Sequence, residues 1–122
     1  MVSTVSVMAE DYSNITGHYE RYIDNKIDTN AAYIDVANHE HDNFQLSGSA
    51  LWVGNAENGN VNMGNIEGVF PFHNNTIRYS SDDCKLVVTC SEESLIVSND
   101  NLMCGGLNVS FDGLYKKVNK DH

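Results

Sequence analysis

Four copies of a short pattern, apolar-x-Gly-x-apolar, constrain the fold of this chain more than any other feature. Each copy lies where apolar and polar residues alternate, as in a strand with one buried face. The four glycines are Gly17, Gly48, Gly68 and Gly113, and all share the parity of the inward residues. A missing side chain on the inner face lets a strand bend sharply or lets another backbone come close. The pattern therefore predicts a sheet that curls into a closed barrel.

The remaining alternation predicts eight strands joined by tight turns, over residues 15–24, 31–37, 44–53, 61–72, 76–80, 84–90, 95–98 and 107–115. The fourth strand should be bulged near Gly64, because its apolar parity switches between Met63 and Ile66. Its pairing should weaken at Pro71, which has no N–H to donate. We expect an all-β fold, an eight-stranded antiparallel meander barrel over residues 14–119 with little or no helix, after a flexible lead-in at 1–13.

One basic residue, Arg21, falls on the inward parity near the end of the first predicted strand. A long cationic side chain can bury its stem while its head lies against aromatic rings. We expect Arg21 to cap one end of the barrel in this way. A functional role is the alternative.

The charge of the chain limits its partners. Seventeen acidic residues against seven Lys and Arg give a net charge of -10 and a pI near 4.6. Such a surface repels phosphate backbones and anionic lipid, so we expect no nucleic-acid or membrane partner. No segment approaches the ~20 apolar residues of a membrane-spanning helix. A basic protein or a cation is the partner that this charge favours, and acidity that serves solubility alone is the other interpretation.

Three cysteines, Cys84, Cys90 and Cys104, allow one disulfide. Cys84 and Cys90 would share a strand and lie roughly 20 Å apart, too far for a bond, so any disulfide must use Cys104. Cys84 is the preferred partner because it opens its strand after a turn, whereas Cys90 shares the inward parity and is expected to be a buried free thiol. A disulfide indicates an oxidising compartment, and three reduced core cysteines in a cytosolic protein are the alternative.

Four segments carry a resemblance to a known group of proteins. They read Ile-Thr-Gly-His-Tyr-Glu at 15–20, Asn-Ile-Glu-Gly-Val-Phe at 65–70, Asp-Asp-Cys-Lys-Leu-Val-Val at 82–88, and Cys-Gly-Gly at 104–106 with Val-Ser-Phe-Asp-Gly-Leu-Tyr-Lys-Lys at 109–117. Over residues 15–118 the chain resembles small exported bacterial domains with a lipocalin-like barrel, in which the cysteines before strands six and eight are joined.

This resemblance implies a periplasmic or secreted location and a role as an inhibitor of lysozyme or as an immunity protein against an amidase toxin of the cell wall. The first residues lack the positive charge and the apolar run of a signal peptide, so an exported protein would be present here in its mature form. The Ser-Gly-x-x-Tyr motif of lysozyme-inhibitor barrels is absent, since Ser47-Gly48 is followed by Ser49-Ala50-Leu51. No inhibitory residue is therefore carried over.

Acidic loops at 38–43, 54–60 and 99–103 supply the candidate partner-binding residues. These are His39, Glu40, His41, Asp42, Glu57 and Asp100. We expect the three loops to form an acidic rim that plugs the cleft of a basic peptidoglycan hydrolase, with charge steering the encounter.

Catalysis and cofactors have weaker support in the sequence. His39-x-His41 could supply two metal ligands, but the remaining ligands could come only from distant residues such as His18 or His73, so a polar loop is the preferred interpretation and we expect no cofactor. No nucleophile motif occurs, and we expect no catalytic residue.

The alternative function is a carrier of a small apolar ligand in a barrel cavity. The aromatic residues that could line such a cavity are Tyr19, Tyr33, Trp52 and Phe70. Simple core packing is the more common role of such residues.

Overall fold

The computed structural model describes residues 15–28, 30–40, 42–55, 59–91, 93–106 and 108–118. The described residues form nine strands and no α-helix. The strands are β1 (Gly17–Ile23), β2 (Lys26–Ile27), β3 (Ala32–Asn38), β4 (Asn43–Asn55), β5 (Asn60–His73), β6 (Thr76–Ser81), β7 (Cys84–Cys90), β8 (Ser94–Ser98) and β9 (Gly113–Val118). The predicted lead-in at 1–13 lies outside the described residues.

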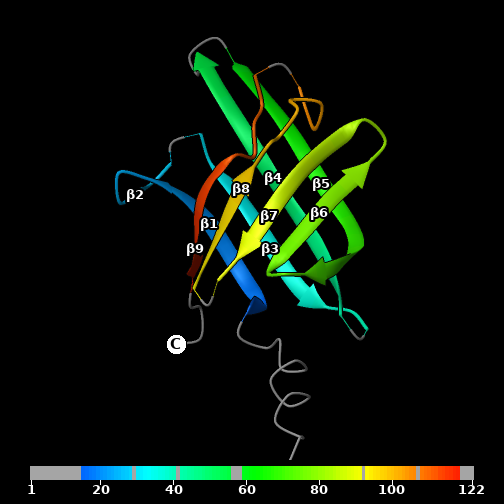
Figure 1. The fold of residues 1–122 in the computed structure, drawn as a ribbon. Coiled ribbons are helices and arrows are strands. Elements are labelled where there is room, and N and C mark those ends of the chain that lie inside the picture. The colour runs from blue at the N-terminus through cyan, green and yellow to red at the C-terminus, as the bar shows by residue number, and fades with distance from the viewer. Residues whose placement is uncertain are drawn as a thin grey trace, which may run out of the picture.

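The sheet closes on itself. Every pairing is antiparallel, and β1 pairs with β9 as well as with β3. The closing ladder joins residues 18–22 of β1 to residues 114–118 of β9 (Figure 1). Strand β2 pairs with β1 alone and lies outside the ring. The ring therefore consists of β1 and β3 to β9, and the predicted eight-stranded antiparallel barrel is confirmed.

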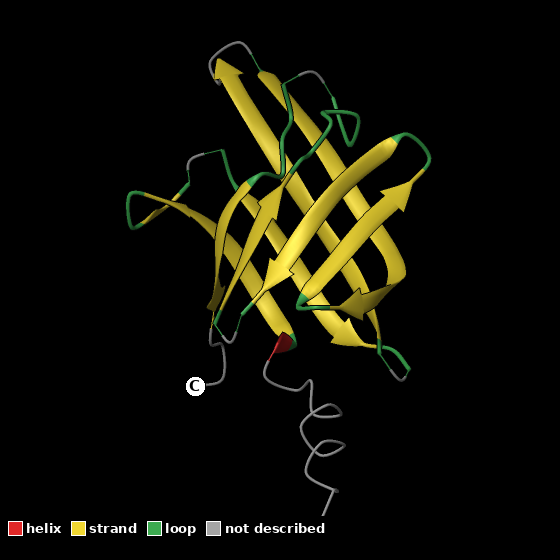
Figure 2. Cartoon of the chain, in the orientation of Figure 1, coloured by secondary structure: helices red, strands yellow, loops and turns green. Residues whose placement is uncertain are grey.

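Because neighbouring strands run in opposite directions, their connections alternate between the two ends of the barrel (Figure 2). The β3–β4, β5–β6 and β7–β8 connections lie at one end, which we call the β3–β4 end. The β4–β5, β6–β7 and β8–β9 connections lie at the other, which we call the β8–β9 end. The two ends are therefore built from different sets of loops.

Strand β2 was not predicted. It pairs with the end of β1 through a two-residue turn of Asp24 and Asn25, whose φ angles are 54° and 66°. Two consecutive residues with positive φ match the type I′ turn that the twist of a hairpin favours, and Asp and Asn tolerate this conformation. The turn thus prolongs β1 into a short hairpin beside the barrel.

The last predicted strand is wrong in its first half. Strand β9 begins at Gly113 rather than at residue 107, although Val109 and Phe111 are fully buried as their alternation predicted. The Phe111 N–H donates to the Asp100 carboxylate at 2.6 Å, and the Asp100 N–H donates to the Asp112 carboxylate at 3.0 Å. Carboxylates rather than a neighbouring strand take up these bonds, so the segment folds over the β8–β9 end as a buried loop.

The predicted bulge near Gly64 is also wrong. The β4–β5 ladder runs without interruption past Gly64, and its register shifts only between Val53 and Asn55. Met63 points outward and is 56% exposed, so an apolar side chain on the outer face produced the apparent switch of parity. The ladder from β5 to β6 ends at Phe72, next to Pro71, as predicted.

The interior of the barrel is filled by the protein's own side chains. The largest fully buried ones are Tyr19, Tyr115, Phe44, Phe111, Ile34, Leu46, Ile77, Leu86, Leu95, Val88 and Val109. Trp52 and Phe70 pack against this cluster. Tyr33, which was a candidate for lining an inner cavity, instead points outward and is 39% exposed. That candidate is wrong, because Ala32 and Ile34 hold the inward positions of β3.

The glycines of the repeated pattern permit close approach, as predicted. A Cβ on Gly48 would clash with the carbonyl oxygen of Tyr33 on the neighbouring strand. A Cβ on Gly113 would lie 2.7 Å from Cδ of Arg21, and Gly113 has a φ of 145° that other residues rarely adopt. The two glycines therefore let β4 and β9 approach their neighbours more closely than other residues would.

Arg21 caps the β8–β9 end, as predicted, and does more than stack. Its guanidinium carbon lies 6.0 Å from the centre of the Tyr115 ring. Its Nε is 2.9 Å from the Asp28 carboxylate, and both side chains are almost fully buried. The two terminal nitrogens donate to the carbonyls of Asn30 and Ser110, each at 2.6 Å. One side chain thus joins β1 to two loops that are far apart in the sequence.

The predicted pairing of the cysteines is confirmed. Cys84 and Cys104 form a disulfide, and Cys90 is free and buried. The disulfide links the first residue of β7 to the long β8–β9 connection. It therefore fixes that connection against the side of the barrel.

Replacing Arg21 by methionine should lower the free energy of unfolding by about 3–5 kcal/mol, because it leaves the buried Asp28 carboxylate without its cation. Chemical denaturation monitored by circular dichroism measures the change. Arg78→Met, at an exposed position of β6, is the matched control and should cost no more than about 0.5 kcal/mol. Equal losses in the two variants would contradict the capping role.

Candidate functional site

The structure does not bring the predicted acidic rim together. His39, Glu40 and Asp42 are exposed at the β3–β4 end, whereas Asp100 lies at the β8–β9 end. His41 and Glu57 lie outside the described residues. A single surface made from the 38–43 loop and the 99–103 loop is therefore not formed, because the two loops connect strands at opposite ends.

Asp100 holds its own loop. Its two carboxylate oxygens accept from the N–H groups of Leu102 and Phe111, at 2.7 and 2.6 Å. A carboxylate that accepts two backbone N–H groups in this way serves mainly to hold its loop in place. The 38–43 loop differs, since the Asp42 carbonyl accepts from the Phe72 N–H at 2.8 Å while the side chains of His39, Glu40 and Asp42 stay exposed. These three residues remain available to a partner.

The residues that do converge line a hollow on the outer face of β1, β3, β4 and β5. This outer groove has a volume of about 450 Å³ and is lined by Glu20, Ile27, Ala31, Ala32, Tyr33, Ser49, Leu51 and Met63. Strand register places the lining: Tyr33 lies opposite both Glu20 and Ser49, and Leu51 lies opposite Met63. Cross-strand neighbours on one face are close enough to act together.

The outer groove is largely apolar. Ile27 and Met63 are each 56% exposed, and Tyr33 is 39% exposed. Exposed apolar side chains scattered singly are normal, but a group of them in one hollow is typical of an interaction site. The sequence carried this signal at the outward positions Leu51 and Met63, which the interpretation of the inner face left unused, and at Tyr33, which that interpretation placed on the inner face.

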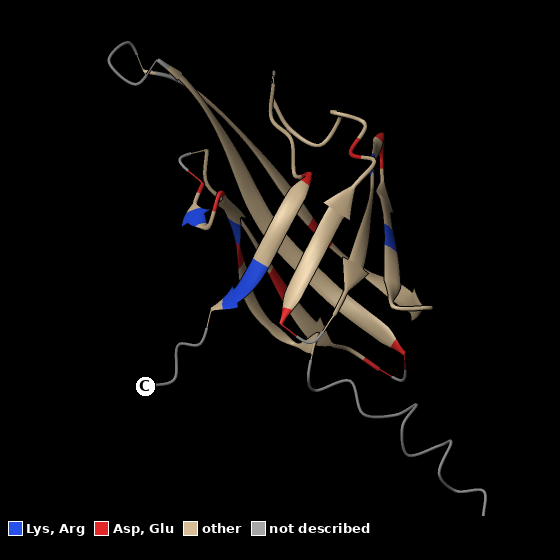
Figure 3. Cartoon of the chain, turned by 60° about the vertical axis from the view of Figure 1, so that its left-hand side comes forward, with Lys and Arg blue, Asp and Glu red and all other residues tan. Residues whose placement is uncertain are grey.

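Cations lie beside the outer groove on β2 and β9, where Lys26 precedes Ile27 and Lys116 lies opposite Glu20. No Lys or Arg occurs between Ile27 and Ile77, so β3, β4 and β5 carry no such cation (Figure 3). The Glu20 carboxylate lines the groove, and Asp35 is joined to it through His18. The imidazole contacts Asp35 Oδ1 at 2.6 Å and Glu20 Oε2 at 3.1 Å.

His18 also orders the groove wall. Its ring lies 5.3 Å from the ring of Tyr33, with the two planes inclined by 32°. The contact holds Tyr33 upright on the outer face, next to the carboxylates of Glu20 and Asp35. An apolar floor with an acidic edge is therefore the chemistry that this groove offers.

Among the described residues, the buried groups with raised pKa values are not activated nucleophiles. Burial raises the pKa of the Cys90 thiol to about 12. Burial also raises the pKa of the Tyr19 and Tyr115 hydroxyls, which donate to backbone carbonyls of Ile15 and Phe111. These groups stay neutral at physiological pH and act as parts of the core.

Metal binding has no assembled site in the described part of the chain. No group of three or more His, Cys, Asp or Glu is placed there to hold a metal ion. The predicted pair His39 and His41 is only half described, so its capacity stays a prediction. A second hollow, of about 250 Å³, lies beside the β5–β6 turn and is lined by Pro71, His73, Asn74, Thr76 and Arg78.

Comparison with known proteins adds no assignment. No protein family, no curated protein and no solved structure matches this chain. Within the described ranges, no helix is long and apolar enough to cross a membrane.

Cys90 should be unreactive toward thiol reagents in the folded protein. With a pKa of about 12, only about one thiol in ten thousand is ionised at pH 8. Ellman's reagent should therefore label the native protein slowly and the denatured protein at once. Ser80→Cys, at an exposed position of β6, is the control that should react in the native state. Rapid labelling of native Cys90 would contradict its burial.

Proposed function

We propose that this protein is a non-catalytic binding barrel that acts outside the cytosol and engages a basic partner protein through its outer groove. The observation that carries the proposal is the groove itself, an apolar hollow that contains Glu20, with Asp35 joined to Glu20 through His18, and in which β3, β4 and β5 contribute no lysine or arginine. An apolar floor with an acidic edge fits a partner segment that carries an apolar anchor next to a lysine or arginine.

The filled interior supports binding on the outside. Aromatic and aliphatic side chains occupy the barrel axis, among them Tyr19, Phe44 and Tyr115, each fully buried. A barrel of eight strands has an interior just wide enough for side chains to fill. Recognition by this protein is therefore a matter of its outer surface.

The net charge supports a basic partner and disfavours self-association. A chain with a net charge of -10 repels its own copies and attracts cationic proteins, and such steering raises association rates strongly at low salt. The Cys84–Cys104 disulfide is consistent with an oxidising compartment. Together with the resemblance to exported inhibitor barrels, these features make a cell-wall hydrolase, a lysozyme or an amidase toxin, the partner class to test first. Inhibition would be steric, with the barrel covering the cleft of the hydrolase.

A lysine placed in the outer groove should weaken partner binding. Leu51→Lys puts a charge on the apolar floor, and we expect a loss of affinity of roughly tenfold or more, as for a central interface residue. The measurement is biolayer interferometry with a purified basic lysozyme and a purified peptidoglycan amidase, together with their lysis of cell walls. Ile96→Lys, at a position of β8 that is 52% exposed, makes the same charge change outside the groove.

The two variants separate the proposed site from a general charge effect. Ile96→Lys should bind nearly as well as the unchanged protein. Equal losses in both variants would show that net charge alone controls binding and would remove the groove from the proposal. Absence of binding to both hydrolases at low salt would contradict this partner class.

The carrier alternative makes an opposite prediction for Trp52, the only tryptophan, which packs against the core. Because the interior is filled, long-chain fatty acids should leave its fluorescence emission unchanged. A saturable shift at one ligand per protein would contradict the filled barrel and support the carrier. Titration with oleate, with denatured protein as the reference, makes this measurement.

A further inference from the structure

The barrel has one incomplete seam, between β5 and β6. Their ladder holds only Phe72 opposite Ile77 and His73 opposite Thr76. By contrast, β6 and β7 pair over the whole length of β6. No further pair of described residues joins the two strands toward the β8–β9 end. The edge of β5 from Met63 to Val69 is therefore not paired with β6.

A short piece of the β8–β9 connection covers this edge at Met63 and Gly64. We call residues 104–106 the strap. The Gly106 N–H donates to the Met63 carbonyl at 3.2 Å, and Gly105 forms an isolated bridge with Gly64. A Cβ on Gly105 would lie only 2.5 Å from the Gly64 Cα. The strap thus takes the place of a strand, and two facing glycines let it come close enough.

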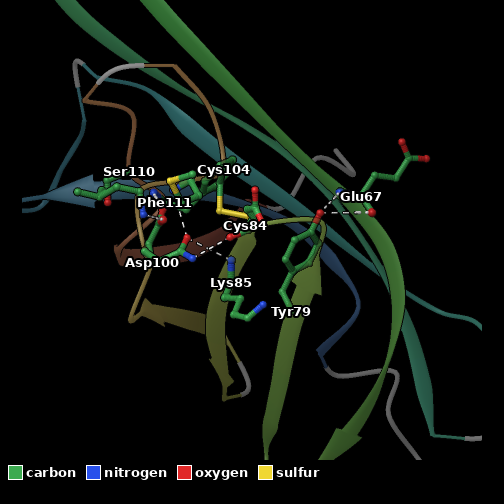
Figure 4. Close-up of a disulfide and its surroundings, with 12 residues drawn as sticks. Glu67, Tyr79, Cys84, Lys85, Asp100, Cys104, Ser110 and Phe111 are labelled. Carbon is green, nitrogen blue, oxygen red and sulfur yellow. Dashed lines mark hydrogen bonds between the residues drawn. A yellow bond between two sulfur atoms is a disulfide. The ribbon is translucent and has the colours of Figure 1, made fainter.

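A tyrosine side chain covers the same edge of β5 at Glu67. The Tyr79 hydroxyl accepts from the Glu67 N–H at 3.1 Å and lies 3.4 Å from the Glu67 carbonyl, to which it donates. One side chain on β6 therefore satisfies both backbone groups of a β5 residue, across the gap that the strands leave (Figure 4). The Tyr79 ring packs on Phe70, with 4.8 Å between ring centres, and is nearly buried.

The disulfide anchors the strap. Cys104, its first residue, is joined to Cys84 at the start of β7, where Asn101 also bonds to the Asp83 carbonyl at 2.8 Å. Leu102 in the same loop has a φ of 67°, a conformation that a leucine rarely adopts. Such a conformation persists only where the surrounding structure holds it, and the disulfide is part of that structure.

We propose that the Cys84–Cys104 disulfide is a redox latch on this seam, and that its reduction uncovers the backbone edge of β5. A dithiol reductant supplies the two electrons. The S–S bond breaks, each sulfur takes a proton to become a thiol, and the two sulfurs of the reductant join in a cyclic disulfide. The strap then leaves Met63 and Gly64, while the ring stays closed through β1 and β9.

The uncovered edge has a defined chemistry. The Met63 carbonyl loses its partner, and a strand edge with unpaired backbone groups accepts an added extended strand. The Met63 side chain lines the outer groove while its carbonyl holds the strap. Release of the strap therefore changes the surroundings of Met63, which also lines the outer groove. The redox latch does not depend on the proposed partner.

Hydrogen exchange of the whole chain tests the latch. With dithiothreitol, the Gly106 amide should exchange at least about tenfold faster because the strap leaves the Met63 carbonyl, whereas the Glu67 amide, which Tyr79 holds, should keep its protection. The amides of the β1–β9 closure should keep their protection. A uniform increase in every strand would mean loss of the whole fold, and an unchanged pattern would mean that the strap holds without its anchor; either result overturns the proposal.

Two sets of variants keep the test independent of the reductant. The double replacement Cys84→Ser and Cys104→Ser should reproduce the reduced pattern without dithiothreitol. Tyr79→Phe in the oxidised protein should speed exchange at Glu67 and leave Gly106 protected. Tyr19→Phe, which removes a buried hydroxyl bond to the Ile15 carbonyl at 2.8 Å, is the matched control and should leave both seam amides unchanged. A Glu67 response in this control equal to that of Tyr79→Phe would overturn the role of Tyr79.

Discussion

The fold depends on the place where the two ends of the sheet meet, and there on one buried cation. Arg21 lies opposite Tyr115 in the β1–β9 ladder, pairs with the Asp28 carboxylate, and donates to carbonyls of the segments around Asn30 and Ser110. A buried ion pair adds little net stability over an apolar pair of the same shape, but it is costly to break and tolerates few alternative arrangements. Its value here is specificity, because it fixes which loop lies over the β8–β9 end.

Closure at β1–β9 contrasts with the open seam at β5–β6. Strand β5 is much longer than its ladder with β6, and its free edge must find other partners, since unpaired backbone groups are expensive when buried. The chain uses the strap at Met63 and the Tyr79 hydroxyl at Glu67. The first of these is held by a covalent bond that the redox compartment controls, whereas the second is not. The closure of the β5–β6 seam by the strap therefore depends on whether the disulfide is intact.

The sequence predicted what alternation and covalent geometry control. Inward parity identified the closed barrel, the capping position of Arg21 and the buried thiol Cys90, and strand length excluded a Cys84–Cys90 bond. It could not show that Val109 and Phe111 belong to a loop. The Phe111 N–H bonds to the Asp100 side chain there instead of to a neighbouring strand, and alternation does not reveal such a contact. The outer groove escaped for a related reason: it exists only once register sets apolar residues of four strands side by side.

The groove and the seam meet at Met63, which lies opposite Leu51 across the β4–β5 ladder. Its side chain belongs to the outer face and its carbonyl to the free edge, so a partner that holds Met63 in its present position also favours the closed strap. Such coupling is reciprocal, because a closed strap that improves partner binding must itself be stabilised by the bound partner to the same extent. An acidic barrel of this kind would bind best in the oxidising compartment where its disulfide is intact, which is also where the proposed partners act.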